Sequence, residues 1–172
     1  MKRGSRAALC ISLLSALALV YAVPASAAES PPSVPVTQPS TLGGTPGLSD
    51  VVLTLRPTAG NSLEVVITCT PNIQYPHASS GNVNIHMTVS CTQEMTYIQV
   101  DIQLYYVGIA KVGDSGLQTR FLTNYSDQHA NSTGCTNGYY QGWGYFYVWC
   151  ALCWPNEGGS SSGWGPINYV QC

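Results

Sequence analysis

The chain has 172 residues, of which 45% are hydrophobic and only 8% are charged. Six basic residues stand against eight acidic ones, so the chain lacks the concentrated positive charge that a dedicated nucleic-acid binder needs. A chain of this length has room for one ordinary domain with short appendages.

Residues 1–27 have the three parts of a secretory signal peptide. A positively charged start, formed by Lys2, Arg3 and Arg6, is followed by an apolar run over 7–23. Small residues then provide a cleavage site of the A-x-A kind. Because a membrane-spanning helix needs about 20 apolar residues, we expect cleavage rather than stable membrane insertion.

Removal of this segment changes both the charge and the cysteine count. Three basic residues then remain against eight acidic ones, which is a net charge of −5. An even number of cysteines in an exported chain indicates disulfides, because disulfides persist in an oxidising compartment. We therefore expect a secreted, extracellular protein with six disulfide-forming cysteines: Cys69, Cys91, Cys135, Cys150, Cys153 and Cys172.

A stalk and a single domain follow the signal peptide. Residues 28–49 are rich in Pro, Ser, Thr and Gly without apolar periodicity, and this composition predicts a disordered stalk. Over 50–172 the pattern changes to short β-branched and aromatic runs separated by turn residues. The first two runs, 51–55 and 63–68, predict two strands.

Strict alternation between apolar and polar residues gives the clearest strand signal, over 83–91 and 98–106. In the second segment the polar side chains of Gln99, Asp101 and Gln103 are expected to face solvent. Further strands are expected over 117–125, 139–150 and 167–172.

About seven strands with regular turn signals and no helical periodicity predict an all-β domain. We expect an antiparallel β-sandwich with immunoglobulin-like or Greek-key connections, and a closed barrel is the main alternative. The segment 157–165, composed mostly of Gly and Ser, is expected to be a mobile loop. A domain of this size gains useful stability from disulfides that contribute about 2–4 kcal/mol each.

Several short motifs carry a family resemblance when taken together. They resemble a group of small secreted β-rich proteins, common in actinobacteria, that have no assigned activity. The resemblance covers about 63–172 and implies secretion and a β domain, but it brings no catalytic residues. Its motifs are Cys-Thr-Pro with Tyr-Pro-His over 69–77, Gly-Asn-Val-Asn with Ser-Cys-Thr over 81–92, Gln-Leu-Tyr-Tyr-Val-Gly over 103–108, and Cys-Thr-Asn-Gly-Tyr-Tyr-Gln-Gly over 135–142.

Cys150 and Cys153 have the spacing of a redox dithiol or of half a zinc site. A redox pair needs a helix N-terminus, whereas an aromatic strand precedes this pair, and no second pair with similar spacing exists to complete a zinc site. We therefore favour structural disulfides, either local or with distant partners. An immunoglobulin-like strand order suggests two hypotheses for the pairing, Cys91 with Cys150 and Cys69 with Cys135.

The chain has three histidines, His77, His86 and His129. Their spacing is not that of a ligand set, so we interpret them as separate surface residues and expect no metal site. Although Asp127 lies two residues from His129, both fall in an expected polar loop, which favours a solvated histidine over a general base.

The sequence also lacks the patterns of common enzyme classes. The carboxylates of Glu64, Glu94 and Asp101 appear isolated, whereas a glycosidase needs two that face each other across a cleft. The chain has no G-x-S-x-G, H-E-x-x-H or phosphate-binding loop. We therefore expect no catalytic residues, no cofactor and no enzymatic activity.

The most unusual segment is the aromatic strand expected over 139–150. Alternate residues of a strand face opposite ways, so an aromatic row shares one face, with Phe146 and Val148 on the other; the row is Tyr139, Trp143, Tyr145, Tyr147 and Trp149. If Phe146 and Val148 face the core, the aromatic row is exposed and could stack on sugars or anchor a protein; otherwise the row serves packing only. The candidate ligand-contact aromatics, including one from the loop that follows, are Tyr139, Trp143, Tyr145, Tyr147, Trp149 and Trp164.

Two functions from different classes fit these features. The first is a secreted, non-catalytic binding or structural module at or outside the cell surface, which engages cell-wall glycan or an extracellular protein. The second is a secreted protease inhibitor that presents the segment after Cys91, residues 92–97, to a protease cleft. Neither function involves nucleic acid.

Overall fold

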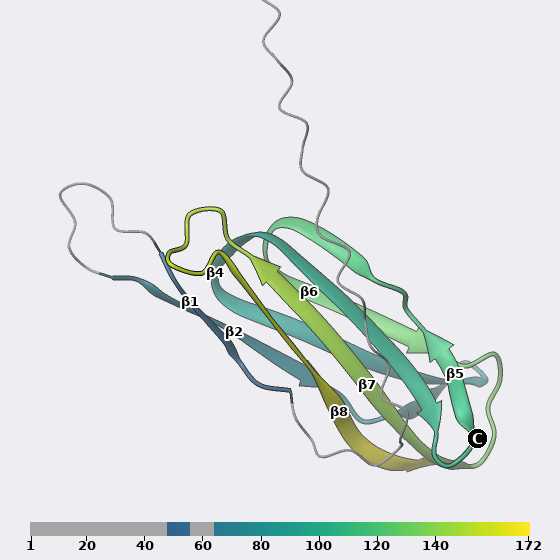
Figure 1. Cartoon of the computed structure of the whole chain (residues 1–172). Helices are drawn as coiled ribbons and strands as arrows, with labels where there is room; N and C mark the ends of the chain where they lie inside the picture. Colours follow the sequence, from purple (N-terminus) through teal and green to yellow (C-terminus); the bar gives the residue numbers. More distant parts are fainter. Residues whose placement is uncertain (1–47, 56–63) are drawn as a thin grey trace, which may run out of the picture. The chain divides into compact units, whose positions relative to one another are not determined.

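The computed structural model describes residues 48–55 and 64–172 (Figure 1). The expected signal peptide and nearly all of the expected stalk lie outside these residues. The described part contains no helix, and its strands form an antiparallel sheet. Its eight strands are β1 (Val51–Thr54), β2 (Val66–Ile73), β3 (His77–Ser79), β4 (Asn82–Tyr106), β5 (Ala110–Asp114), β6 (Gln118–Asn131), β7 (Gly138–Trp149) and β8 (Gly158–Val170).

The strand β4 is the centre of the sheet, and it replaces two strands that the sequence predicts. It runs for 25 residues without a turn, because the stretch between the two alternating segments stays extended. A register shift between Ser90 and Met95 marks a bulge, which lets so long a strand bend. The N-terminal half of β4 pairs with β2, β3 and β6, and the C-terminal half pairs with β5, β6 and β7.

The path β1-β2-β4-β7-β8 is one continuous hydrogen-bonded sheet, with β3, β5 and β6 attached to β4. The sheet curls far enough for its terminal strands β1 and β8 to touch. Beside this contact, the backbone N–H of Ser49 donates to Oγ of Ser161 over 3.0 Å. The expected all-β antiparallel class is confirmed, whereas the expected sandwich of two separate sheets is not, because the sheet is continuous and nearly closed.

The core lies on the concave side of this curled sheet. As the alternation predicts, every second residue is fully buried there over 83–89 and over 98–104 of β4, and Phe146 and Val148 of β7 join them. Gly144, also on β7, faces the same core. A Cβ atom at this position would lie 2.5 Å from Sδ of Met87 and 2.8 Å from Cδ1 of Ile73, so glycine allows the close approach of β7 to the opposite side of the core.

All six expected cysteines form disulfides, but both hypotheses for their pairing are wrong. Cys69 is bonded to Cys91, which lies directly opposite it across β2 and β4. The hypotheses placed this end of β4 beside β7, whereas β2 is its neighbour. The remaining bonds are Cys135–Cys172 and the local Cys150–Cys153.

Two segments expected to be loops are strands. The strand β6 continues to Asn131 and so includes the expected polar loop at 127–129, and β8 includes most of the expected mobile loop at 157–165. Gly and Ser have little intrinsic preference for strands, so the local sequence predicts a loop. Pairing with β7 along almost its whole length overrides that preference in β8.

Candidate functional site

A second cluster of buried side chains lies on the opposite face of the sheet from the core, over the C-terminal half of β4 together with β7 and β8. We call it the outer aromatic cluster. Its members are Tyr105, Trp143, Tyr145 and Trp164, with the partly buried Tyr147 packed against them.

Strand register brings these residues together. Trp143 of β7 lies opposite Trp164 of β8, and a register shift between Gln141 and Trp143 makes this alignment possible. The ring of Tyr105 meets that of Trp164 edge-on, with 5.1 Å between the centroids. This is a favourable geometry for aromatic pairs, so the cluster contributes packing energy as well as buried area.

The expected ligand-contact aromatics divide into buried and accessible residues. Phe146 and Val148 face the core, as one of the two alternatives assumed. The aromatic row on the other face is nevertheless not exposed as a whole, because Trp143 is 4% exposed and Tyr145 is 7% exposed, whereas Tyr139 is 58% exposed. Neither alternative considered from the sequence describes this arrangement, because the row packs against its own face of the sheet. Of the remaining candidates, Tyr147 and Trp149 are half-buried and Trp164 is buried.

A further aromatic group lies at the C-terminal end of β7. The ring centroids of Tyr97 and Trp149 are 5.4 Å apart, and those of Tyr97 and Tyr147 are 5.9 Å apart. Burial, together with the neighbouring Tyr147, raises the pKa of Tyr97 to about 12. Tyr97 is therefore a neutral, packed phenol at every physiological pH.

A line of buried polar side chains accompanies the aromatic cluster on β4. The expectation that Gln99, Asp101 and Gln103 face solvent is wrong, because all three are buried. The hydroxyl of Tyr105 donates to Oε1 of Gln103 over 2.8 Å, and Nε2 of Gln103 donates to Oδ2 of Asp101 over 3.0 Å. The large aromatic side chains on β7 bury this row, and an alternating pattern on one strand cannot reveal that.

Asp101 is not isolated, contrary to the interpretation of the sequence. The β4–β5 pairing places Asp114 opposite Gln103, and the two carboxyl groups interact. Burial raises the pKa of Asp101, and the charge of Asp114 adds to this effect. Burial also acts to raise the pKa of Asp114, but hydrogen bonds from Lys111 and from the backbone N–H of Gly116 outweigh it and lower that pKa.

We expect Asp101→Asn to stabilise the protein near neutral pH. Since the pKa of Asp101 is raised in the folded state, this state holds the proton more tightly than the unfolded state, and the ionised carboxyl lowers stability as pH rises through the folded pKa. The amide keeps an oxygen that can accept from Gln103 without this charge. Unfolding by urea at about pH 7 should show a gain in the free energy of unfolding that shrinks toward about pH 3, where the carboxyl is protonated in both states. A loss at neutral pH would contradict this interpretation.

Two buried polar atoms on the same face lack hydrogen-bond partners. They are the hydroxyl of Tyr145 and Oε1 of Gln141. The other end of the Gln141 amide is held, because its Nε2 donates to the carbonyl of Gly165 over 3.0 Å. A buried polar group without a partner costs free energy, and because both atoms are buried, a ligand could reach them only if the surrounding rings moved.

An exposed aromatic pair lies at the edge of this face. Tyr139 of β7 and Tyr169 of β8 are direct neighbours in register, and their rings meet edge-on at 5.2 Å. Both are more than half exposed. Sequence reasoning included Tyr139 and missed Tyr169 and Tyr105, although the same period-two alternation that selected Tyr139 also places Tyr105 with the outward-facing side chains of β4.

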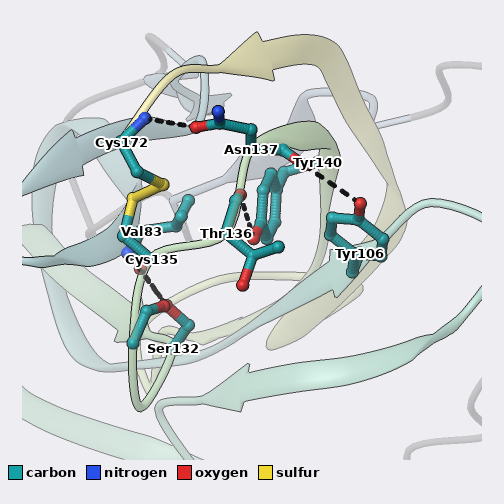
Figure 2. Close-up of a disulfide and its surroundings, with 9 residues drawn as sticks. Val83, Tyr106, Ser132, Cys135, Thr136, Asn137, Tyr140 and Cys172 are labelled. Carbon is teal, nitrogen blue, oxygen red and sulfur yellow. Dashed lines mark hydrogen bonds between the residues drawn. A yellow bond between two sulfur atoms is a disulfide. The ribbon is translucent and has the colours of Figure 1, made fainter.

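A separate cleft of about 410 Å³ lies beside the Cys135–Cys172 disulfide (Figure 2). Its walls include Tyr106, Tyr140 and the loop 132–136. The two phenol hydroxyls already donate to loop carbonyls, Tyr140 to Thr136 over 2.9 Å and Tyr106 to Asn137 over 3.1 Å. These bonds hold the loop in place, so the two phenols have a structural role.

The three histidines lie together, contrary to the expectation of separate surface residues. His86 of β4 is directly opposite His129 of β6, and their ring centroids are 5.5 Å apart. His77 of β3 stacks on the other side of His86, at 6.0 Å. Oδ1 of Asp127, on the same strand as His129, lies 3.4 Å from Nδ1 of His86. The sequence spacing could not reveal this cluster because the three strands come together only through sheet pairing.

The segment after Cys91, considered for protease inhibition, is part of β4 rather than a projecting loop. Its residues 92–94 are exposed at the bulge, but Met95 and Tyr97 are buried. The hydroxyl of Thr92 accepts a hydrogen bond from the backbone N–H of Thr68 over 3.1 Å, which holds the bulge against β2.

Comparison with known proteins gives no assignment, since no protein-family model matches the chain and no curated protein sequence matches it significantly. The part of the chain that the structure describes contains no helix with the length and hydropathy needed to cross a membrane. The arguments for function therefore come from the side chains on the outer face of the sheet.

Proposed function

We propose that the chain is a secreted, non-catalytic binding module that acts at or outside the cell surface, with glycan, such as that of the cell wall, as its ligand. The observation that carries the proposal is the face formed by β4, β7 and β8. There, the exposed pair Tyr139 and Tyr169 borders the packed outer aromatic cluster. Aromatic rings can stack on the apolar faces of sugars, and these two rings are accessible to a ligand.

The surrounding chemistry supports binding rather than catalysis. The paired carboxyls of Asp101 and Asp114 are engaged by Gln103 and Lys111, which are parts of the fold itself. A glycosidase needs its two carboxyl groups free to meet substrate from either side of the scissile bond. This arrangement fits a structural use of the carboxyls.

Export is proposed on three grounds. The first residues have the pattern of a signal peptide, and the motifs over 63–172 resemble secreted actinobacterial proteins. Three intramolecular disulfides are consistent with an extracellular location, because they persist in an oxidising compartment. Recovery of the processed chain from culture supernatant would test export, and retention of the unprocessed chain in cells would contradict it.

We also propose that the curled sheet is a β-sandwich, in which the two layers share β4 and β6. In support, β2 contacts β7 and β8 through the core, as facing layers do. A crystal structure in which β1 and β8 form a continuous hydrogen-bonded ladder would favour a closed barrel instead.

A pull-down on insoluble cell-wall glycan tests the binding function. We expect the double variant Tyr139→Ala/Tyr169→Ala to bind about tenfold more weakly than the parent, since two stacked rings contribute about 0.5–1.5 kcal/mol each. Both residues are exposed, so the variant should fold normally.

The matched control is Tyr125→Ala, which removes an exposed tyrosine from β6, away from this face. It should bind as the parent does. If the parent is not retained on glycan, or if the double variant is retained equally well, the glycan function is wrong and a protein ligand becomes the alternative to test.

A further inference from the structure

All three histidines of the chain lie in one cluster on the outer face of the sheet, over β3, the N-terminal half of β4, and β6. His86 is the middle member, with His129 on one side and His77 on the other. Histidine is rare in this chain, so the gathering of every copy at one place calls for a reason other than surface composition.

The distances within the cluster suit a shared ligand. Two imidazoles that bind one tetrahedral metal ion through nitrogens at about 2.0–2.1 Å have ring centroids about 5 Å apart. The centroids of His86 and His129 are 5.5 Å apart, and those of His77 and His86 are 6.0 Å apart. The planes of His77 and His86 are only 16° apart, so these two rings are stacked and must turn before their nitrogens can point at one ion.

The hydrogen bonds of two rings prepare the other ring nitrogen for coordination. Nδ1 of His86 lies 3.4 Å from Oδ1 of Asp127, and Nδ1 of His77 lies 3.2 Å from the carbonyl of Tyr75. Both oxygens can only accept, so each Nδ1 carries the proton and each neutral ring keeps its lone pair on Nε2. Metal-binding histidines are oriented in this way by a carboxylate or a backbone carbonyl.

From these observations we propose that His77, His86 and His129 bind one divalent ion of a late transition metal, of the Zn²⁺ or Cu²⁺ type. Imidazole nitrogen is a preferred ligand for these ions, whereas Ca²⁺ and Mg²⁺ prefer oxygen. Asp127 is the positioning residue, because it orients His86 without contacting the ion. Cysteine does not compete, since the six cysteines of the described part are all in disulfides.

The ion would complete the site on binding. As the side chains of the described residues are placed, no group of three or more His, Cys, Asp or Glu could hold a metal ion, so the site requires the histidine rings to turn. His77 and His129 are exposed and His86 is half-buried, so the rings have room to turn toward one another. Exposed side chains change rotamer within nanoseconds, so this rearrangement does not require a change in the sheet.

The proposal is tested by calorimetric titration of the full chain, prepared without a polyhistidine tag, with Zn²⁺ and separately with Cu²⁺ at about pH 7.5, where imidazole is mostly neutral. We expect saturable binding of one ion per chain. His86→Ala should weaken it by more than about tenfold, and Asp127→Asn by about tenfold, as for other residues that orient a ligand. His129→Gln, at an exposed position, should also weaken binding.

The matched control is Thr88→Ala, which changes the next outward-facing residue of β4 and should leave metal affinity unchanged. Circular dichroism of each metal-free variant checks that it folds as the parent does. No saturable binding, or binding that both His86→Ala and His129→Gln leave unchanged, would overturn the proposal.

Discussion

Replacement of Cys135 and Cys172 by serine is expected to lower the free energy of unfolding by about 4 kcal/mol. Their disulfide joins the segment before β7 to the C-terminal residue across a sequence separation of 37. Without it the unfolded chain gains the entropy of this long loop. Cys172 is exposed and Cys135 is only partly buried against the core, so serine at these positions loses less packing than at a fully buried site. Urea unfolding of the double variant against the parent measures the difference.

The matched comparison is Cys150→Ala/Cys153→Ala, whose disulfide spans a sequence separation of only 3. Loop entropy predicts a loss of about 2 kcal/mol for this bond. The test is which double variant loses more free energy of unfolding, and we expect it to be the variant that lacks Cys135 and Cys172. A larger loss for the short loop would show that packing around Cys150 and Cys153, both buried, outweighs chain entropy. The Cys135–Cys172 variant should also loosen the neighbouring loop, since the backbone N–H of Cys172 donates to Oδ1 of Asn137 (Figure 2).

Trp143→Ala should reduce the free energy of unfolding by about 3 kcal/mol or more, as for other buried tryptophans. Trp143 is buried among Tyr105, Tyr145 and Trp164, so its removal leaves a cavity in the outer aromatic cluster. Tyr139→Ala, on the same strand and the same face, should change stability by less than about 0.5 kcal/mol, because this side chain is exposed. Thermal and urea unfolding of both variants provide the measurement.

This pair of variants separates packing from binding within one strand. If Trp143→Ala leaves stability unchanged, the outer cluster does not hold the sheet together, and its rings are available for ligand. If Tyr139→Ala is as costly as Trp143→Ala, Tyr139 and Tyr169 belong to the packed cluster and are poor candidates for glycan contact.

Local pattern was sufficient to predict the inward-facing side chains. The alternation in the two halves of β4 correctly identified the buried residues from Val83 to Val89 and from Ile98 to Leu104. The same pattern placed Phe146 and Val148 opposite the aromatic row. These predictions succeed because the direction of a side chain on a strand depends only on the parity of its position.

The local pattern was insufficient to predict which outward-facing side chains are buried. Alternation tells that Asp101 points away from the core, but it leaves the direction of Trp143 open and does not tell what lies beside either side chain. Tyr105, Trp143 and Trp164 come from three strands and cover each other and the polar row on β4. Burial on this face is therefore a property of neighbouring strands rather than of any one of them.

The sequence by itself determined that the chain folds into antiparallel strands, that six cysteines form disulfides, and which residues of the two alternating segments of β4 face the core. Only the tertiary structure decided that Cys91 meets Cys69, that Asp101 meets Asp114, and that the three histidines converge. The physical reason is that alternation and composition are local, whereas strand pairing joins segments far apart in sequence. Both candidate sites, the aromatic face and the histidine cluster, are products of that pairing.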